Sequence, residues 1–257
     1  MRDPSLLIRR CLLALLVAGP SFASAAPSQT RLTVWDLKLG ASVYQMPPID
    51  EFKGYACGSN GGPPRQQLSG WSEYAKCRSE DDGLHEVYFE YDDELEYIAR
   101  AKELPRELSR FAGTMERSFA IIVSALFDDA GVLRGLRLVS DARPDRRPDA
   151  FMVEMKSRAE AYELGGAMAA RFGIESDRDC RQLPRAEGES SVGSTFIKRV
   201  CEKLDPGTGT QVSLRVNYYR KPGQSGRNPF LETQLTKGEF ESSTWLEIRL
   251  AGGQQNR

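Results

Sequence analysis

The stretch FAIIVSALFDDAGVLRGLRLVS, residues 119–140, carries the clearest β-hairpin signal in the chain. Two apolar runs, 119–127 and 132–140, are separated by the four residues DDAG. Aspartate and glycine are favoured in tight turns because they tolerate the backbone angles that such turns need. The stretch therefore predicts two antiparallel strands joined by a tight turn.

Further strands and one helix are predicted on either side of this hairpin. Alternating apolar and polar residues predict strands over Leu84–Tyr91, 195–203, 210–220 and 239–250. A helix is predicted from about Ala150 to Arg171, ended by Gly173. Its apolar stripe at helical spacing consists of Phe151, Met155, Ala159, Tyr162 and Ala169. The pair Gly165-Gly166 either weakens the last turns of this helix or allows close packing there.

The N-terminal residues have the pattern of a secretion signal. The basic start MRDPSLLIRR is followed by the apolar run CLLALLVAG and by Ala23-Ser24-Ala25, a small-residue cleavage site. That run is shorter than the roughly 20 residues that span a bilayer. We expect a signal peptide over residues 1–25, cleavage near Ala25, and a periplasmic or secreted mature chain with no transmembrane segment.

The composition of the mature chain is that of an ordinary globular protein. Cleavage after residue 25 leaves 232 of the 257 residues, enough for one large domain or two small ones. Removing three arginines and one aspartate changes the net charge from −1 to −3. This near balance gives no indication of nucleic acid or an anionic membrane as a partner.

Four cysteines remain after cleavage, and an even number in an exported chain predicts disulfides. Near neighbours close the smaller loops, so we expect the pairs Cys57–Cys77 and Cys180–Cys201. Each loop of about 20 residues would contribute roughly 3 kcal/mol of stability in the chain-entropy model. The C-x-x-C spacing typical of redox or metal sites is absent from the sequence, which favours structural disulfides.

The two cysteine pairs also suggest how the chain is organised. Their spacings are 20 and 21 positions, and an alternating strand follows each pair, as in an internal duplication of about 124 residues. The polar connector DARPDRRPD (141–149) lies between them. We expect an α+β fold of two small modules, 26–143 and 144–257, each with an antiparallel sheet, a helix and a disulfide-stapled loop.

The first stapled segment, YACGSNGGPPRQQLSGWSEYAKC (55–77), is a candidate binding loop. Its glycines Gly58, Gly61 and Gly62 offer backbone N–H groups to an anion, although the following prolines break the pattern of a phosphate loop. Trp71 and Tyr74 either line a recognition surface or, in the case of Trp71, pack in a small core behind the disulfide.

Catalytic and metal-binding motifs are scarce in the sequence. His85 is the one histidine, which excludes a multi-histidine metal site within one chain. The acidic strand supplies the weak metal candidates Glu86, Glu90 and Asp92. Strand alternation places Glu86 and Glu90 on one face, either as a carboxylate patch for a hard cation or as the wet face of a half-buried sheet.

One short segment is similar to a known family. LKLGASVYQM (37–46) followed by GGPP (61–64) resembles the opening of small periplasmic modules of the outer-membrane assembly lipoprotein type. The resemblance implies an antiparallel sheet after that opening. The lipidated cysteine of those modules is missing and the disulfide loop is extra, so no residue roles are transferred.

These features favour an exported, non-catalytic binding or accessory protein that recognises a periplasmic or envelope protein and needs no cofactor. Two alternatives stay open. One is a carrier of a small ligand or hard metal ion that uses the acidic strand. The other is a carboxylate-based hydrolase of envelope glycans, for which no particular pair of acids is selected.

Overall fold

The computed structural model describes residues 32–91, 115–116, 119–140, 158–224 and 240–251. The predicted signal peptide and the predicted boundary between residues 143 and 144 lie outside this part of the chain. The described strands are β1 (Phe52–Cys57), β2 (His85–Tyr91), β3 (Met115–Glu116), β4 (Phe119–Phe127), β5 (Leu133–Ser140), β6 (Cys180–Gln182), β7 (Ile197–Asp205), β8 (Thr210–Tyr219) and β9 (Glu241–Leu250).

The described helices are short. They are the 3-10 helices η1 (Val34–Asp36), η2 (Val43–Gln45) and η3 (Trp71–Lys76), the π-helical turn η4 (Glu160–Leu164), and the α-helices α4 (Gly165–Arg171) and α5 (Ser176–Asp179). The predicted helix therefore ends at Arg171 as expected, and Gly173 takes a φ of +58° just beyond it.

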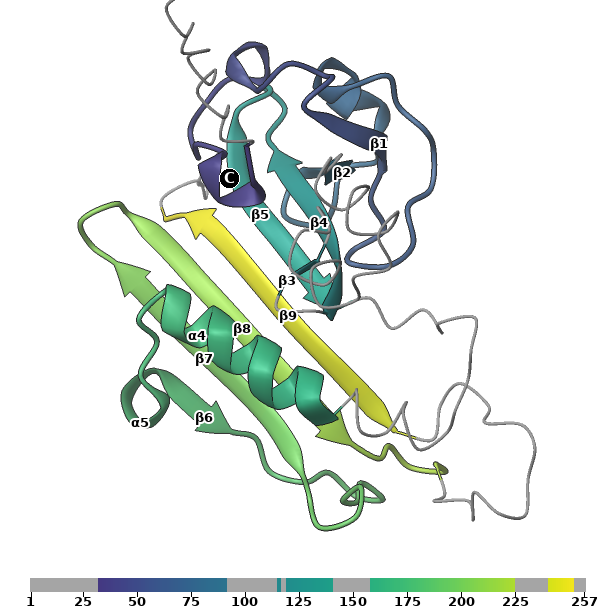
Figure 1. Cartoon of the computed structure of the whole chain (residues 1–257), viewed down its shortest axis with the longest axis vertical. Coiled ribbons are helices and arrows are strands. Elements are labelled where there is room, and N and C mark those ends of the chain that lie inside the picture. Colours follow the sequence, from purple (N-terminus) through teal and green to yellow (C-terminus); the bar gives the residue numbers. More distant parts are fainter. Residues whose placement is uncertain (1–31, 92–114, 117–118, 141–157, 225–239, 252–257) are drawn as a thin grey trace, which may run out of the picture. The chain divides into compact units, whose positions relative to one another are not determined.

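The strands form one antiparallel sheet in the order β1-β2-β4-β5-β9-β8-β7-β6, with β3 paired to β4. The prediction of an α+β protein with two separate modules is therefore wrong. The pairing that overturns it joins β5 to β9, from Gly135 opposite Arg249 to Val139 opposite Trp245 (Figure 1). Strand β5 is buried along almost its whole length. Strand β4 pairs with one edge of β5, and β9 forms the hydrogen bonds that the other edge needs.

The predicted hairpin is confirmed as β4 and β5, paired from Ile121 opposite Ser140 to Phe127 opposite Leu133. Asp128 organises the turn because its Oδ1 accepts the backbone N–H groups of Ala130 at 3.0 Å and Val132 at 2.9 Å. Gly131 takes a φ of +72° there, a backbone conformation that favours glycine.

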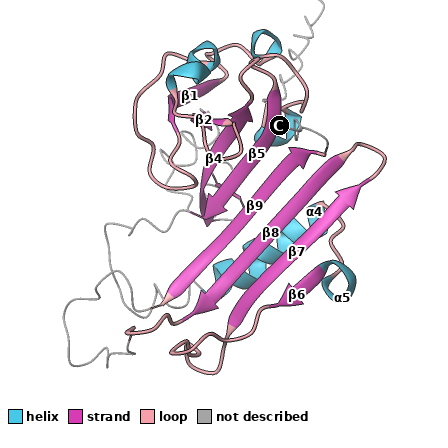
Figure 2. Ribbon diagram, turned by 180° about the vertical axis from the view of Figure 1, so that it is seen from behind, coloured by secondary structure: helices cyan, strands magenta, loops and turns pink. Residues whose placement is uncertain are grey.

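The two faces of the sheet differ. The inner face carries the main hydrophobic core, which includes Leu138, Leu214 and Leu246, and the helical segment η4–α4 packs on this face against β8 and β9. The outer face carries the residues that alternate with these. Figure 1 shows α4 in front of β7 and β8, and the reverse view in Figure 2 shows the strands in front of the helix.

Both predicted disulfides, Cys57–Cys77 and Cys180–Cys201, are formed. The first joins the end of β1 to the residue after η3, whereas the second joins directly opposed residues of β6 and β7. The two staples therefore have different structural settings. Two disulfides fit an extracellular or periplasmic protein, because such compartments are oxidising.

None of the helices in the described ranges is both long and apolar enough to cross a membrane.

Candidate functional site

The loop closed by the first disulfide, residues 58–76 and called the stapled loop below, is fixed along the free edge of β1. Backbone hydrogen bonds run from Cys57 N to Gln66 O at 2.7 Å, from Arg65 N to Cys57 O at 2.8 Å and from Leu68 N to Tyr55 O at 2.8 Å. The loop thus satisfies the polar groups of an edge strand, and its own backbone is held in one conformation.

Glu86 anchors the glycine-rich part of this loop to the outer face of the sheet. Its side chain, only 3% exposed, accepts the backbone N–H groups of Asn60 at 2.5 Å and Gly61 at 3.3 Å. A Cβ atom at Gly58 would lie 2.6 Å from Glu86 Oε2, so the close approach depends on glycine there. The backbone N–H groups of this loop were predicted to be available to an anion. In the structure, those of Asn60 and Gly61 bind the carboxylate of Glu86 instead.

Arg137 binds Glu86 and two further carboxylates on the outer face. Its side chain is 3% exposed, and its guanidinium forms a bidentate pair with Glu80 at 2.8 and 2.9 Å. Nη1 also lies 3.1 Å from Glu86 Oε2, and Nε donates to Glu247 Oε2 at 2.9 Å. We call these four residues the carboxylate clamp, because one buried cation holds three acids.

A second guanidinium extends the carboxylate clamp towards solvent. Arg249 lies 2.5 Å from Glu247 through Nε and 2.5 Å from Asp82 through Nη1. The whole group contains four carboxylates and only two guanidiniums. Several of these carboxylates are shielded from water, and negative charge is in excess. Ionisation of Glu86, the most buried of the four acids, is therefore unfavourable.

The pKa values of two acids in the carboxylate clamp shift in opposite directions. Burial raises the pKa of Glu86, outweighing the attraction of Arg137 and the hydrogen bond from Asn60. At Glu80 burial also acts to raise the pKa, but the hydrogen bonds and charge of Arg137 outweigh it and lower the pKa. Glu86 is buried and contacts both a guanidinium and backbone N–H groups of the stapled loop. These contacts are those of a residue that holds the loop on the sheet.

The predicted binding residues Trp71 and Tyr74 lie mainly against the core. Trp71 is 3% exposed and makes edge-on contacts with Tyr55 and Phe89, whose ring centroids lie 4.8 and 4.9 Å away. Tyr74 is half-buried, and its hydroxyl donates to the carbonyl of Asp129 at 3.1 Å. The structure thus gives Trp71 the core position that was one of its two predicted roles.

The other predicted site residues do not come together. His85 is buried, with Nδ1 2.7 Å from the carbonyl of Cys77 and Nε2 3.0 Å from Asp129 Oδ1. Glu90 is half-buried and accepts a hydrogen bond from Tyr88, and Asp92 lies outside the described residues. The interpretation of Glu86 as a solvent-facing residue of a half-buried sheet is wrong, because the stapled loop covers its side chain. Within the described residues, no three His, Cys, Asp or Glu side chains are placed to hold a metal ion.

A row of side chains on the outer face, two of them exposed and two half-buried, was not predicted. It consists of Arg181, Val200, Arg215 and Trp245, which are directly opposed in register across β6, β7, β8 and β9. Arg181 and Arg215 are exposed, and neither makes a hydrogen bond or ion pair within the described part of the chain. We call these four residues the arginine row.

The arginine row meets the stapled loop at Trp245. The guanidinium of Arg137 lies 5.0 Å from the centre of the Trp245 ring, and a Cβ atom at Gly61 would lie 2.7 Å from Trp245 Cζ3. The half-buried indole is therefore held between the carboxylate clamp and the loop. Through Trp245, the exposed arginines on β6 and β8 belong to the same surface as the stapled loop.

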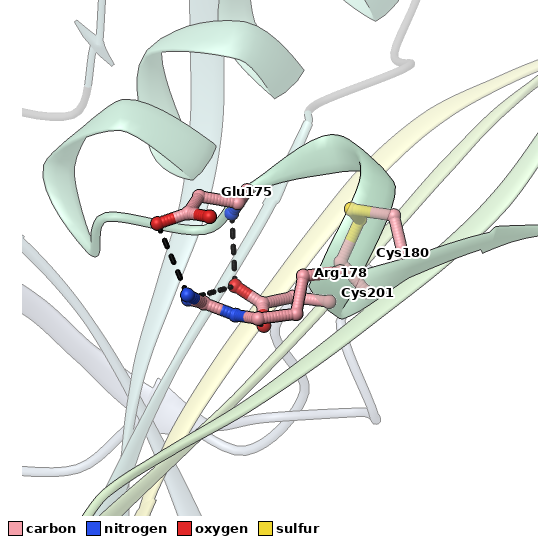
Figure 3. The surroundings of a disulfide bond; sticks show 5 residues. Glu175, Arg178, Cys180 and Cys201 are labelled. Carbon is pink, nitrogen blue, oxygen red and sulfur yellow. Dashed lines mark hydrogen bonds and ion pairs between the residues drawn. A yellow bond between two sulfur atoms is a disulfide. The ribbon is translucent and has the colours of Figure 1, made fainter.

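The second disulfide holds the outer end of the arginine row, because Arg181 directly follows Cys180 on the edge strand β6. Figure 3 shows the short helix α5 beside this disulfide, with Arg178 paired to Glu175 at 3.1 Å. The backbone N–H of Glu175 also donates to Asp179 at 2.8 Å. Strand β6 is thus joined covalently to β7 at the position before Arg181.

The sequence contained only part of the signal for the arginine row. Alternation in 210–220 separates Arg215 from the apolar positions of the same strand, but it does not say which residues lie opposite. The position of Arg181 and Arg215 in one row, with Val200 between them, follows from the pairing of three strands and from the Cys180–Cys201 bond.

Comparison of the chain with protein-family models, with curated proteins and with solved structures finds no match.

Proposed function

We propose that this chain is an exported, non-catalytic binding protein that recognises a periplasmic or envelope protein through the outer face of its sheet. The observation that carries the proposal is the arginine row, where two exposed guanidiniums make no hydrogen bond or ion pair with the residues that the structure describes. Arginine and tryptophan are over-represented at the energetically important positions of protein interfaces. A surface that is already ordered also loses little conformational entropy on binding.

The state of the carboxylate clamp supports a binding role over a hydrolytic one. A general acid or nucleophile has to reach the substrate, whereas Glu86 is almost fully buried under the stapled loop and engaged by Arg137. Loss of both acceptor oxygens of this side chain, as in Glu86→Ala, is therefore expected to weaken the attachment of the loop rather than a chemical step. The alternatives of a metal carrier and a glycan hydrolase stay predictions, and titration calorimetry with calcium tests the first of them.

The proposal is tested by capture of partners from a cell-envelope extract on immobilised mature protein, with mass spectrometry to identify them. The test variant is Arg181→Glu with Arg215→Glu. The matched control is Lys38→Glu with Arg78→Glu, which changes the charge equally at two exposed residues elsewhere.

We expect the same protein to be retained by the wild type and the control, and its recovery to fall at least about tenfold with the arginine variant. Equal recovery by all three proteins, or no protein retained by any of them, would overturn the proposed function.

A further inference from the structure

We infer that the partner presents an acidic peptide segment with an apolar side chain between two carboxylates, and that this segment lies across the arginine row. The inference rests on the proposed function and names the chemistry that the same surface recognises. Three properties of the row lead to it, namely the uncompensated charge, the spacing of the guanidiniums and the apolar residues between them.

The charge on this part of the outer face is not balanced within the described residues. In the neighbouring row on one side, Lys198 already pairs with Glu189 at 2.7 Å. In the row on the other side, Glu247 is held by Arg137 and Arg249, which leaves Glu202 as the exposed carboxylate of that row. One carboxylate cannot neutralise both Arg181 and Arg215. A partner with negative charge therefore completes the surface.

The spacing of the two arginines suits two separate carboxylates. Arg181 and Arg215 lie two strands apart, which corresponds to roughly 10 Å between their backbones. In an extended segment, residues four positions apart share a face and lie about 13 Å from each other. Two long arginine side chains bridge that difference, and each guanidinium presents a fork that matches one carboxylate.

The apolar members of the row favour a peptide over a polyanionic sugar or lipid headgroup. Val200 lies between the two arginines, and Trp245 follows Arg215, both half-buried and both on the same face. A purely polyanionic ligand would leave these side chains without a complementary surface. A segment that alternates acidic and apolar side chains on one face matches all four positions.

The test uses synthetic peptides built on the repeat Glu-Ser-Leu-Ser, which places glutamate and leucine alternately on one face of an extended chain. One control peptide replaces leucine by serine and the other replaces glutamate by lysine. Binding to the mature protein is measured by calorimetry and by NMR titration. The protein variants are Arg181→Glu with Arg215→Glu, and the control Lys38→Glu with Arg78→Glu.

We expect the Glu/Leu peptide to bind with a Kd below about 1 mM, and its affinity to fall at least about tenfold in the arginine variant but not in the control. The affinity is also expected to fall when salt is raised from about 0.05 to 0.5 M. Absence of binding at about 1 mM peptide overturns the inference. Equal affinity for the peptide without leucine also overturns it, because the ligand would then be any acidic polymer.

Failure of this inference is distinguishable from failure of the proposed function. If the peptides do not bind but capture from the envelope extract still depends on Arg181 and Arg215, the surface binds a partner of other chemistry. If capture is independent of both arginines as well, the outer face is not the recognition surface at all.

Discussion

Glu86 and Glu80 contact the same guanidinium of Arg137, yet their environments give them opposite effects on stability. Burial raises the pKa of Glu86 above its ordinary value of 4.5, so the folded protein holds this proton more tightly than the unfolded chain does. Arg137 outweighs burial at Glu80, so there the folded protein holds the proton less tightly. The sign of the pH dependence therefore differs between two acids of one cluster.

We predict that Glu86→Gln unfolds at a higher urea concentration than the wild type at pH 7. Glutamine keeps one acceptor oxygen for the loop amides and removes a charge whose ionisation costs stability once the pH rises above about 4.5. The advantage should shrink as the pH is lowered towards about 4, where Glu86 is protonated.

The matched variant Glu80→Gln should behave in the opposite way. It loses stability at pH 7, and the deficit shrinks as the pH falls below about 4.5 through the lowered pKa of Glu80. Urea unfolding of the wild type and both variants between about pH 2.5 and 8 measures the two effects. The same sign for both variants would contradict the described environments.

At the scale of single elements, the helical segment η4–α4 shows why neighbouring glycines differ. A Cβ atom at Gly165 would lie 2.8 Å from Val216 Cγ2, whereas one at Gly166 would meet nothing within 4 Å. Of the two predicted roles for the pair, close packing thus applies to Gly165. Gly166 is exposed and has no such contact.

We predict that Gly165→Ala destabilises the protein by about 1–2 kcal/mol, because overpacking against β8 exceeds the gain in helix propensity. Gly166→Ala should stabilise it by roughly 0.5–1 kcal/mol, because alanine is the better helix former in open space. Both changes are measured by urea unfolding. Equal effects of the two substitutions would argue against the close contact with Val216.

The two disulfides should also differ in their accessibility to thiols. Cys57, Cys77 and Cys201 are buried, whereas Cys180 is half-exposed on the edge strand. Thiol–disulfide exchange requires access to a sulfur atom, so Cys180–Cys201 should be reduced first in native protein treated with a dithiol. Alkylation followed by peptide mass spectrometry gives the order. Reduction of both bonds only on global unfolding would refute this prediction.

For the whole molecule, the β5–β9 pairing makes one sheet of strands from both halves of the chain. Unfolding should therefore be a single cooperative transition, since separation of the halves would break the central ladder and expose buried side chains of β5. Fluorescence of Trp71 and of Trp245, each followed in a variant in which Trp35 and the other tryptophan are replaced, should coincide with far-ultraviolet circular dichroism. Two resolved transitions would contradict a continuous sheet.

Local features of this fold could be predicted from the sequence because they depend on neighbouring residues. The 119–140 hairpin follows from two apolar runs and the turn residues DDAG, and the disulfide pairing follows from short loop lengths. The buried face of the helix was predicted only in part. Ala159 and Ala169 of the predicted stripe pack against the core, but Tyr162 is 55% exposed. Ala161, Leu164 and Met168, which were not in the stripe, are buried in the core, and Phe151 and Met155 lie outside the described residues. A π-helical turn over Glu160–Leu164 lengthens the repeat locally, so a stripe drawn at 3.6 residues per turn fails at Tyr162.

By itself, the sequence determined the strands β2, β4, β5, β7, β8 and β9, where the hairpin turns, and which cysteines pair, because each depends on periodicity, turn chemistry or loop length. The strands β1, β3 and β6 were not predicted. The tertiary structure alone decided that β5 pairs with β9, that Glu86 is covered by the stapled loop, and that Arg181 and Arg215 share one row. These features arise between residues distant in sequence. They depend on which strand edges satisfy each other's hydrogen bonds and on which apolar faces are buried together, and no local pattern encodes that choice.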